Sequence, residues 1–330
     1  MLFPIQSINA QCPSTGCTTT ISGVNTTNYT VNVGQKLCLA SGAIYSGTVT
    51  MNGGTLENCA TAPQSFGLLY SGATSSIVNN YGTVSFASVN IDQGIFNNYG
   101  IYLESNNIDI QNTAIFNNYD SVYSGANLVV TNSAQFINWG SLDVINNFDV
   151  INDGYMENHG YIHGHDRFKI GSEFYNTGVI LIDGLWDNVA PGGTFTNDGG
   201  CVTMDRLKNE VGIFGLNCGT ITIANSSENF PTGTIDGNIA IVDNATYPFV
   251  DVNSGFVGAS VIGTSCGCPG PGDNCHDTIT GTVFIDNNVD SLLDAGASLL
   301  SGVTVDLYID YNGNGIIDGA DSIYTSTSTD

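Results

Sequence analysis

Residues 94–100 read GIFNNYG, and residues 114–120 read AIFNNYD. The shared pattern is an apolar residue, an asparagine two positions later, usually an aromatic residue next, and then a glycine. It recurs every 18 to 21 residues, and a repeat of this length is the sequence signature of a solenoid. The copies are VNNYG at 78–82, FNNYG at 96–100, FNNYD at 116–120, FINWG at 136–140, MENHG at 156–160, FYNTG at 174–178 and FTNDG at 195–199, with LENCA at 56–60 as an earlier copy.

The segments between the motifs alternate apolar and polar residues, as strands do. Examples are Val84 and Phe86, or Ile108 and Ile110. These segments are rich in Gly, Asn, Thr and Ser and contain few good helix formers. We therefore predict an all-β fold, a single-stranded parallel β-helix over residues 11–263 with about 20 residues per coil. We expect right-handed winding, because this hand is the usual one for such folds.

The repeated asparagines are predicted to be part of the scaffold. Strand alternation places them on the same inward side as the apolar residue of each motif. An amide donates to one coil and accepts from the other, so a column of asparagines satisfies its own hydrogen bonds. We expect the glycine to permit a sharp turn. A second series is predicted to repeat the device at another corner: Asn112, Asn132 and Asn152.

The charge balance excludes several classes of partner. The 330 residues include only five basic residues against thirty acidic ones, for a formal net charge of −25. Nucleic acid is excluded as a partner because its phosphates need lysines and arginines, and anionic membranes are disfavoured for the same reason. A strongly acidic surface instead suits calcium and an extracellular medium. No apolar run has the length of a transmembrane helix.

The N-terminus, MLFPIQSINAQC, resembles the end of a secretory signal peptide. We interpret residues 1–10 as a signal remnant and expect the mature chain to begin near Gln11. The positive n-region of a signal is missing, so an ordinary apolar N-terminus is the alternative. Export through a signal peptide predicts an extracellular or cell-surface protein.

Nine cysteines also favour export, because disulfides form in oxidising compartments. We expect local pairs that are close in sequence: Cys12 with Cys17, Cys38 with Cys59, and Cys201 with Cys218. Three more lie in a Gly/Pro-rich stretch: Cys266, Cys268 and Cys275. A zinc site is the alternative for these three, although they lack the paired CxxC spacing that is typical of zinc.

Residues 264–280, GTSCGCPGPGDNCHDTI, break the repeat and are interpreted as a linker between domains. Two acidic loops follow with the oxygen-donor spacing of an EF-type calcium loop, so calcium is the predicted cofactor. Ser291 replaces the usual glycine of the first loop and Ala297 its last carboxylate, and a solvated acidic turn is the alternative. The predicted ligands are Asp286, Asn288, Asp290 and Asp294 in the first loop and Asp310, Asn312, Asn314, Asp318 and Asp321 in the second.

Here a resemblance to a known family adds to the spacing. GTVFIDNNVDSLLDAG at 281–296 and LSGVTVDLYIDYNGNGIIDGAD at 300–321 together resemble the B-type repeat of serine-aspartate repeat surface adhesins. The resemblance covers residues 278–330 only. It implies an immunoglobulin-like β-sandwich over 281–330, incomplete in this chain, that binds calcium and forms a rigid stalk on the cell surface. The preceding β-helix is similar to secreted bacterial β-helix repeat proteins of the adhesin kind.

Catalysis is the alternative function, because parallel β-helices also carry polysaccharide lyases and glycoside hydrolases. Chemistry-bearing side chains concentrate in ENHGYIHGHDRFK at 157–169. His163 and His165 share a strand face and can bind a metal with His159 or Asp166, while a lyase can use Arg167 and Lys169 to abstract a proton beside a carboxylate. These side chains also fit a polar face without function. The alternative catalytic or metal cluster is His163, His165, Asp166, Arg167 and Lys169.

A ring occupies the position after the ladder asparagine in five coils. One ring per coil on the outer face can hold a sugar chain or an apolar partner, or can simply stiffen the turns. This aromatic stripe consists of Tyr81, Tyr99, Tyr119, Trp139 and His159. We therefore predict a non-enzymatic secreted or cell-surface protein, adhesive or structural, with a polysaccharide or a surface protein as its partner. No catalytic residue is assigned in this prediction.

Overall fold

The computed structural model describes residues 12, 15–71, 76–86, 89–189, 192–244, 250–261, 302–309 and 322–328. The predicted signal remnant at 1–10, the linker at 264–280 and all predicted calcium ligands lie outside these residues. The chain divides into two compact units, Met1–Cys275 and His276–Asp330, and each is described by itself.

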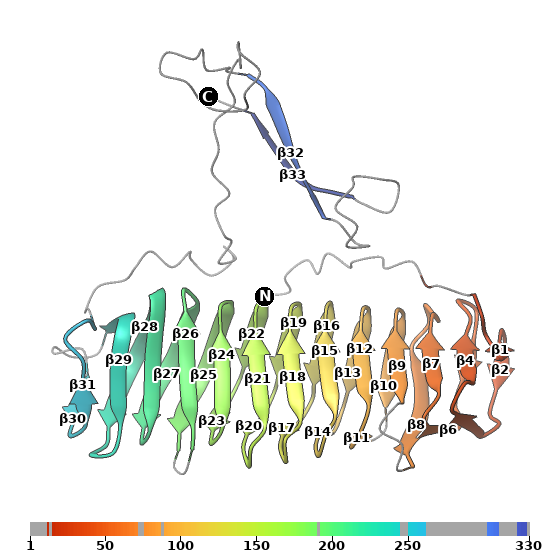
Figure 1. The fold of residues 1–330 in the computed structure, drawn as a ribbon, viewed down its shortest axis with the longest axis horizontal. Helices are drawn as coiled ribbons and strands as arrows, with labels where there is room; N and C mark the ends of the chain where they lie inside the picture. The colour runs from red at the N-terminus through yellow and green to blue at the C-terminus, as the bar shows by residue number, and fades with distance from the viewer. Residues whose placement is uncertain are drawn as a thin grey trace. The chain divides into compact units, whose positions relative to one another are not determined.

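The first unit is a β-solenoid of about 11 turns, and the described part of the chain contains strands and no helix. Figure 1 shows the coils stacked side by side along one axis. Each regular coil contributes three short strands, and each strand pairs in parallel with its counterpart one coil away. The stacked strands therefore form three sheets. The predicted all-β parallel β-helix is confirmed.

Sheet 1 carries the repeated asparagine motif. Its strands are β1 (Thr19–Ile21), β4 (Lys36–Leu39), β7 (Thr55–Asn58), β9 (Ile77–Asn80), β12 (Ile95–Asn98), β15 (Ile115–Asn118), β18 (Gln135–Asn138), β21 (Tyr155–Asn158), β24 (Glu173–Asn176) and β26 (Thr194–Asp198). The register repeats without slippage, so that Phe96 lies opposite Phe116 and Phe116 opposite Phe136.

Sheet 2 follows the turn that carries the aromatic stripe. Its regular strands are β10 (Thr83–Phe86), β13 (Ile101–Glu104), β16 (Ser121–Ser124), β19 (Ser141–Val144) and β22 (Tyr161–Gly164). Sheet 3 closes each coil with β3 (Tyr29–Asn32), β6 (Thr48–Asn52), β11 (Val89–Ile91), β14 (Ile108–Ile110), β17 (Leu128–Val130), β20 (Phe148–Val150) and β23 (Arg167–Ile170). The strand β8 (Gln64–Tyr70) pairs in both sheets.

The later coils are built from longer strands that pass through the corners. These are β25 (Val179–Asn188), β27 (Cys201–Asn209), β28 (Gly212–Asn229) and β29 (Thr234–Asp243), followed by β30 (Val252–Asn253) and β31 (Phe256–Val257). A separate pair near the N-terminus consists of β2 (Val24–Asn25) and β5 (Ile44–Tyr45).

The core is a continuous apolar column inside the solenoid. In each copy of the motif the first residue is buried, from Val78 at 2% exposure to Phe195 at 0%. The rings of Phe96 and Phe116 stack with centroids 4.8 Å apart, and those of Phe116 and Phe136 follow at 5.1 Å. The inward direction of these residues was predicted from the alternation and is confirmed.

The asparagine ladder of sheet 1 is also confirmed. From Asn58 to Asn197, each Nδ2 donates to the Oδ1 of the next coil over 2.7–2.8 Å. The side chains are 0–1% exposed. Both ends are satisfied, because the Ala60 backbone N–H donates to Asn58 Oδ1 and Asn197 Nδ2 donates to the Gly200 carbonyl. An amide in such a column replaces the hydrogen bonds that it would make to water.

The second predicted ladder is wrong, and a different one exists. Asn112, Asn132 and Asn152 are exposed and have φ of 60°, 56° and 51°, so they form left-handed turns, which asparagine tolerates better than most residues. The second buried ladder lies in sheet 3. It runs through the buried Asn188, Asn209 and Asn229 and ends at the exposed Asn253, with Nδ2–Oδ1 distances of 2.8, 2.8 and 2.9 Å.

Of the six motif glycines, only Gly199 has the positive φ, 69°, of a special turn conformation, and the other five serve a different purpose from the one predicted. Gly82, Gly100, Gly140, Gly160 and Gly178 do not have positive φ, so a special turn conformation is not their reason. A Cβ on Gly140 would overlap the carbonyl oxygen of Asp120 in the preceding coil, and one on Gly160 would overlap that of Gly140. Glycine is therefore favoured because successive coils pack backbone against backbone at this corner.

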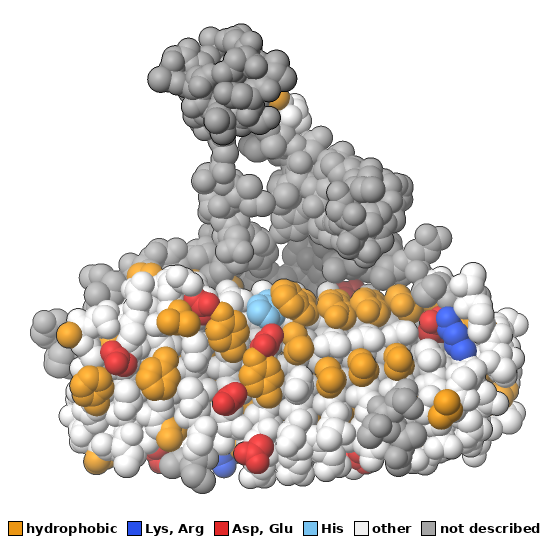
Figure 2. All heavy atoms as spheres, in the orientation of Figure 1, with side chains coloured by type: hydrophobic (Ala, Val, Ile, Leu, Met, Phe, Trp, Pro, Cys, Tyr) orange, Lys and Arg blue, Asp and Glu red, His pale blue; other side chains and the backbone are white. Residues whose placement is uncertain are grey.

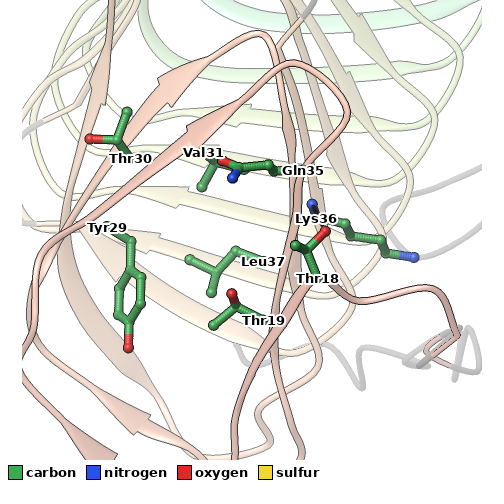
Figure 3. Close-up of a pocket in the computed structure, with 8 residues that line it drawn as sticks. All are labelled: Thr18, Thr19, Tyr29, Thr30, Val31, Gln35, Lys36 and Leu37. Atoms are coloured by element: carbon green, nitrogen blue, oxygen red, sulfur yellow. Dashed lines mark hydrogen bonds between the residues drawn. The ribbon is translucent and has the colours of Figure 1, made fainter.

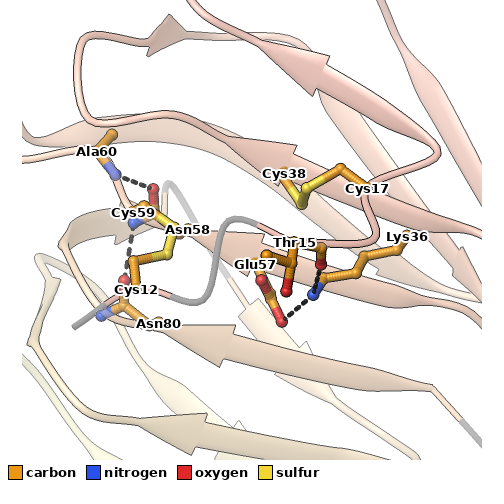
Figure 4. The surroundings of a disulfide bond; sticks show 10 residues. All are labelled: Cys12, Thr15, Cys17, Lys36, Cys38, Glu57, Asn58, Cys59, Ala60 and Asn80. Carbon is orange, nitrogen blue, oxygen red and sulfur yellow. Dashed lines mark hydrogen bonds and ion pairs between the residues drawn. A yellow bond between two sulfur atoms is a disulfide. The ribbon is translucent and has the colours of Figure 1, made fainter. Parts of the chain in front are cut away.

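Two disulfides pin the N-terminal coils, and their pairing differs from the prediction. Cys12 pairs with Cys59 and Cys17 with Cys38, with Cα atoms 5.6 and 5.9 Å apart. The expected pairs Cys12/Cys17 and Cys38/Cys59 are wrong. Cys38 is 21 residues, about one period, from both Cys17 and Cys59, so its partner is set by the path of the chain before β1 and not by the spacing. Figure 4 shows both disulfides beside the Lys36–Glu57 ion pair, whose Nζ and Oε1 are 2.7 Å apart. Cys201 and Cys218 are also disulfide-bonded.

In the second unit the structure describes an antiparallel pair, β32 (Thr304–Ile309) and β33 (Ser322–Ser328). The register places Ile309 opposite Ser322. The second predicted calcium loop, residues 310–321, follows β32 in sequence and lies outside the described residues.

Candidate functional site

The aromatic stripe lies at the corner between sheets 1 and 2. The rings of Tyr81 and Tyr99 stack with centroids 5.0 Å apart and 10° between planes, and those of Tyr99 and Tyr119 at 4.8 Å and 5°. Trp139 and His159 stack in the same way at 3.9 Å and 17°. In these stacks the ring faces are turned along the solenoid axis toward each other. The stripe therefore presents ring edges to solvent, except at Trp139, which is 53% exposed.

Outward residues of sheet 1 add an apolar band beside the stripe. Ile77, Ile95 and Ile115 lie in register on three successive strands, and each is partly exposed. Figure 2 shows apolar side chains in rows along this face of the solenoid. We call the stripe and this band together the apolar face. Its outward residues in later coils are Ile137, Tyr155, Tyr175 and Phe214.

Burial favours the neutral hydroxyl of two tyrosines of the stripe, Tyr81 and Tyr99. Burial raises the pKa of Tyr81 to about 12, with the neighbouring Tyr99 and Glu57 adding to the effect. Burial also raises the pKa of Tyr99, again with help from the next ring, Tyr119. These hydroxyls stay protonated across the physiological range, so the stripe carries no charge of its own at these positions.

The stripe ends at His159, which is held by a small polar network. Nδ1 lies 2.8 Å from Thr177 Oγ1 and Nε2 lies 3.1 Å from Glu157 Oε2, while the hydroxyl of Tyr155 donates to Glu157 Oε1. Burial acts to raise the Glu157 pKa, but the hydrogen bonds from Tyr155 and His159 outweigh burial and hold the pKa below its ordinary value. His159 is thus fixed as the last ring of the stripe and does not join the other histidines.

His163 and His165 form a separate cluster on sheet 2 with two aspartates. His163 Nε2 lies 2.9 Å from Asp183 Oδ2, and His165 Nε2 lies 2.8 Å from Asp143 Oδ1. His165 Nδ1 also approaches Asp183 Oδ2 at 3.2 Å, and the two imidazole centroids are 3.9 Å apart. The ligand atoms of Asp143, His163 and His165 all lie within 4.8 Å of one another.

The remaining members of the predicted cluster point elsewhere. Asp166 is exposed in the turn after β22, and Arg167 and Lys169 belong to β23 in sheet 3. Arg167 pairs with Asp149 at 3.3 Å. Lys169 lies in register between Asp149 and Asp187 of the adjacent coils. The structure therefore divides the predicted cluster between two sheets and gives the metal-binding pair other partners than His159 and Asp166.

Asp143 and Asp183 were not predicted as members of this cluster, although the repeat contains the signal that finds them. Both lie 20 residues from His163, which is one period before and one period after. The second ladder was not predicted either, and its signal is the same apolar-x-Asn spacing as in sheet 1, in Trp186-x-Asn188 and Leu207-x-Asn209.

A shallow pocket opens at the N-terminal end of the solenoid. Figure 3 shows the eight residues that line it, which come from β1, β3 and β4 and the segments beside them. Its floor is apolar, because Val31 and Leu37 are 3% and 2% exposed, and its rim is made of threonines, Tyr29, Gln35 and Lys36. Lys36 is already paired with Glu57, so this pocket offers no unpaired charge to a ligand.

No family model, curated protein or solved structure matches the chain. Within the described part of the chain, no helix has the length and apolar character that a membrane crossing requires.

Proposed function

We propose that this chain is a non-enzymatic protein of the cell surface or the extracellular medium, and that its solenoid presents the apolar face for adhesion. The observation that carries the proposal is the concentration of exposed apolar groups on this face. Ile77, Ile95 and Ile115 run in register over three coils beside the stacked tyrosines, and Trp139 follows in a later coil with half of its surface exposed. Contiguous exposed apolar surface on a soluble protein is typical of an interaction site.

The scaffold beneath the face supports this function. Each coil is joined to the next by backbone hydrogen bonds, by buried stacked rings and by the asparagine ladder. A surface built on such elements changes little on binding, so little conformational entropy is lost when a partner docks. A rigid and flat surface suits another extended surface better than it suits a small molecule.

We propose a surface protein as the partner and keep a neutral polysaccharide as the alternative. Sugars bind to aromatic side chains through exposed ring faces, whereas the tyrosines of the stripe present edges and stack on each other. The aliphatic band also favours apolar protein contacts. The net charge of −25 disfavours acidic partners of either kind.

The arrangement of the basic groups supports a non-enzymatic function over a polysaccharide lyase or hydrolase. Arg167 is paired with Asp149, and Lys169 stands between two aspartates in a row where charge alternates from coil to coil. A general base needs a free route to its substrate proton. Carboxylates beside each of these groups would repel a uronate substrate.

For the second unit we propose a calcium-stabilised immunoglobulin-like stalk. The proposal is supported by the sequence of residues 310–321, whose oxygen donors have the spacing of an EF-type loop, and by the antiparallel pairing of the flanking strands β32 and β33. Calcium would stiffen this loop and perform no chemistry. Titration of the chain with calcium tests this part, because Asp310→Asn with Asp321→Asn should remove one bound ion if the loop is a calcium site.

The adhesion proposal is tested with a triple variant, Tyr99→Ser/Tyr119→Ser/Trp139→Ser, on immobilised surface proteins and neutral polysaccharides. The matched control is Tyr123→Ser, because Tyr123 is an exposed tyrosine on the outer side of β16 in sheet 2. We expect the triple variant to lose binding and the control to keep it, with unchanged circular dichroism in both. Equal binding by all three proteins would reject the apolar face.

Two further readouts separate the alternatives. The chain has two tryptophans, and Trp186 is fully buried, so iodide quenching of fluorescence reports on Trp139. A partner that docks on the apolar face should protect Trp139 from iodide. Size-exclusion chromatography of the polysaccharides after incubation detects cleavage, and shortened polymer would contradict the non-enzymatic proposal.

A further inference from the structure

We propose that Asp143, His163 and His165 bind a divalent ion of the zinc class, with Asp183 as the group that orients the imidazoles. This site is independent of the apolar face and of the calcium loops. The four residues come from three consecutive coils. The ligand Asp143 belongs to β19, the two ligand histidines to β22 and the turn after it, and the orienting Asp183 to β25.

The donor set fits such an ion. Two imidazoles and a carboxylate are the ligands of many zinc sites, and an open fourth position is then taken by water. Calcium prefers six to eight oxygen ligands, so two imidazoles select against it. Side-chain exposure of 34% for His165 and 39% for Asp143 leaves room for the water and for entry of the ion.

The spacing also fits. With metal–nitrogen and metal–oxygen bonds of about 2.0–2.1 Å in a tetrahedron, neighbouring ligand atoms lie about 3.3 Å apart. His165 Nε2 and Asp143 Oδ1 are already 2.8 Å apart, and all three ligand atoms lie within 4.8 Å of one another. Small side-chain rotations therefore convert the present hydrogen bond into coordination without movement of the strands.

Asp183 supplies the outer support that metal-bound histidines usually have. A ligating imidazole commonly donates its second N–H to a carboxylate, which fixes its tautomer and orientation. Asp183 Oδ2 lies 2.9 Å from His163 Nε2 and 3.2 Å from His165 Nδ1, so one carboxylate serves both rings. The bound ion would thus tie three coils together from the outside, opposite to the amide ladders that tie them from within.

The test is equilibrium dialysis of the full chain against zinc, without reductant and with calcium in excess. We expect one zinc ion per chain that calcium does not displace. His165→Gln and Asp143→Asn should lose this ion, and Asp183→Asn should weaken its binding by about 10–100-fold, as outer-sphere carboxylates do elsewhere. His159→Gln is the matched control, because this histidine lies in the same coil but is held by Glu157 and Thr177.

Two measurements keep the result interpretable. Cobalt in place of zinc should give the visible absorption of a nitrogen- and oxygen-ligated tetrahedral ion in the wild type and in His159→Gln only. Zinc should also raise the midpoint of thermal unfolding in these two proteins and not in His165→Gln. Unchanged zinc binding in His165→Gln would place the ion elsewhere, at the Cys266, Cys268 and Cys275 segment for example, and would overturn the proposal. Displacement by calcium would overturn it as well.

Discussion

Asn118 Nδ2 donates to Asn138 Oδ1 over 2.7 Å, and both side chains are completely buried. The same amide of Asn118 accepts from Asn98 and also donates to the Ser141 carbonyl. One side chain therefore satisfies groups of three coils in an otherwise apolar interior. The stability of the solenoid depends on this continuity, because a gap leaves buried polar atoms without partners.

Asn118→Ala should lower the free energy of unfolding by about 2–3 kcal/mol, because it leaves Asn138 Oδ1 without its donor in the core. The matched control is Asn117→Ala on the outward side of the same strand, where Asn117 bonds to Asn97 at a partly exposed position. The control substitution should lower the free energy of unfolding by about 0.5 kcal/mol or less. Urea midpoints measure the difference, and equal midpoints for the two variants would contradict the ladder's energetic role.

Gly140→Ala should lower the free energy of unfolding by about 1–3 kcal/mol, because the new methyl group meets the Asp120 carbonyl and forces two coils apart. Gly42→Ala is the control, since a Cβ at Gly42 meets nothing within 4 Å. Thermal unfolding compares the two. If Gly140→Ala is as stable as the control, the coils at this corner pack less closely than the structure shows.

Stability should fall as the pH rises from about 4 toward neutrality because of Glu104. This inward carboxyl of β13 is 1% exposed, and burial raises its pKa against the opposing hydrogen bonds from the Asn106 and Ser105 backbone. The unfolded chain loses the proton at a lower pH than the folded one. The stabilising contribution is therefore complete below the unfolded pKa and is lost as pH passes the folded pKa.

Glu104→Gln should remove this part of the pH dependence and raise stability near neutral pH. Glu173→Gln, which changes an exposed carboxyl on the outer side of β24, is the control and should keep the wild-type profile. Denaturant midpoints across the pH range give both profiles. A Glu104→Gln profile that parallels the wild type would show that Glu104 does not titrate differently on folding.

Tryptic digestion tests the disulfide pairing directly. In sequence, Cys12 and Cys17 precede Lys36, and Cys38 and Cys59 follow it. The next basic residue after Lys36 is Arg167. With Cys12–Cys59 and Cys17–Cys38 bonds, the peptide that ends at Lys36 stays joined to Leu37–Arg167 until reductant is added. Local pairs would let the two peptides separate without reduction. Mass spectrometry of the unreduced digest distinguishes the two results.

Several features followed from the repeat alone. The period of about 20 residues predicted the coil, and the alternation around Phe96 and Phe116 predicted which side chains point inward. The ladder from Asn58 to Asn197 was predictable because a buried amide in a periodic column has its own copy as the nearest partner. These inferences need only the geometry of a single strand and the fact that each coil repeats the previous one, shifted along the solenoid axis.

Pairings between residues that are not equivalent positions of the repeat depended on how the coils close. The disulfides join cysteines that are 47 and 21 positions apart, and the spacing alone does not select these pairs, because Cys38 is also 21 positions from Cys59. Asn112 is an asparagine like the residues of the ladder, but it lies in a left-handed turn. Its position at a corner, and not its side chain, sets its φ.

The chain's own pattern thus settles the solenoid, its apolar core and its main ladder, since each repeats one residue environment many times. The three-dimensional path of the chain settles which unlike residues meet. It brings Asp143 and Asp183 to His163 and His165, and it turns Arg167 and Lys169 to another sheet. The physical reason is that side chains within a β-strand alternate between two faces in a fixed order. The backbone conformation at a corner, in contrast, decides on which sheet and on which face the next side chain lies.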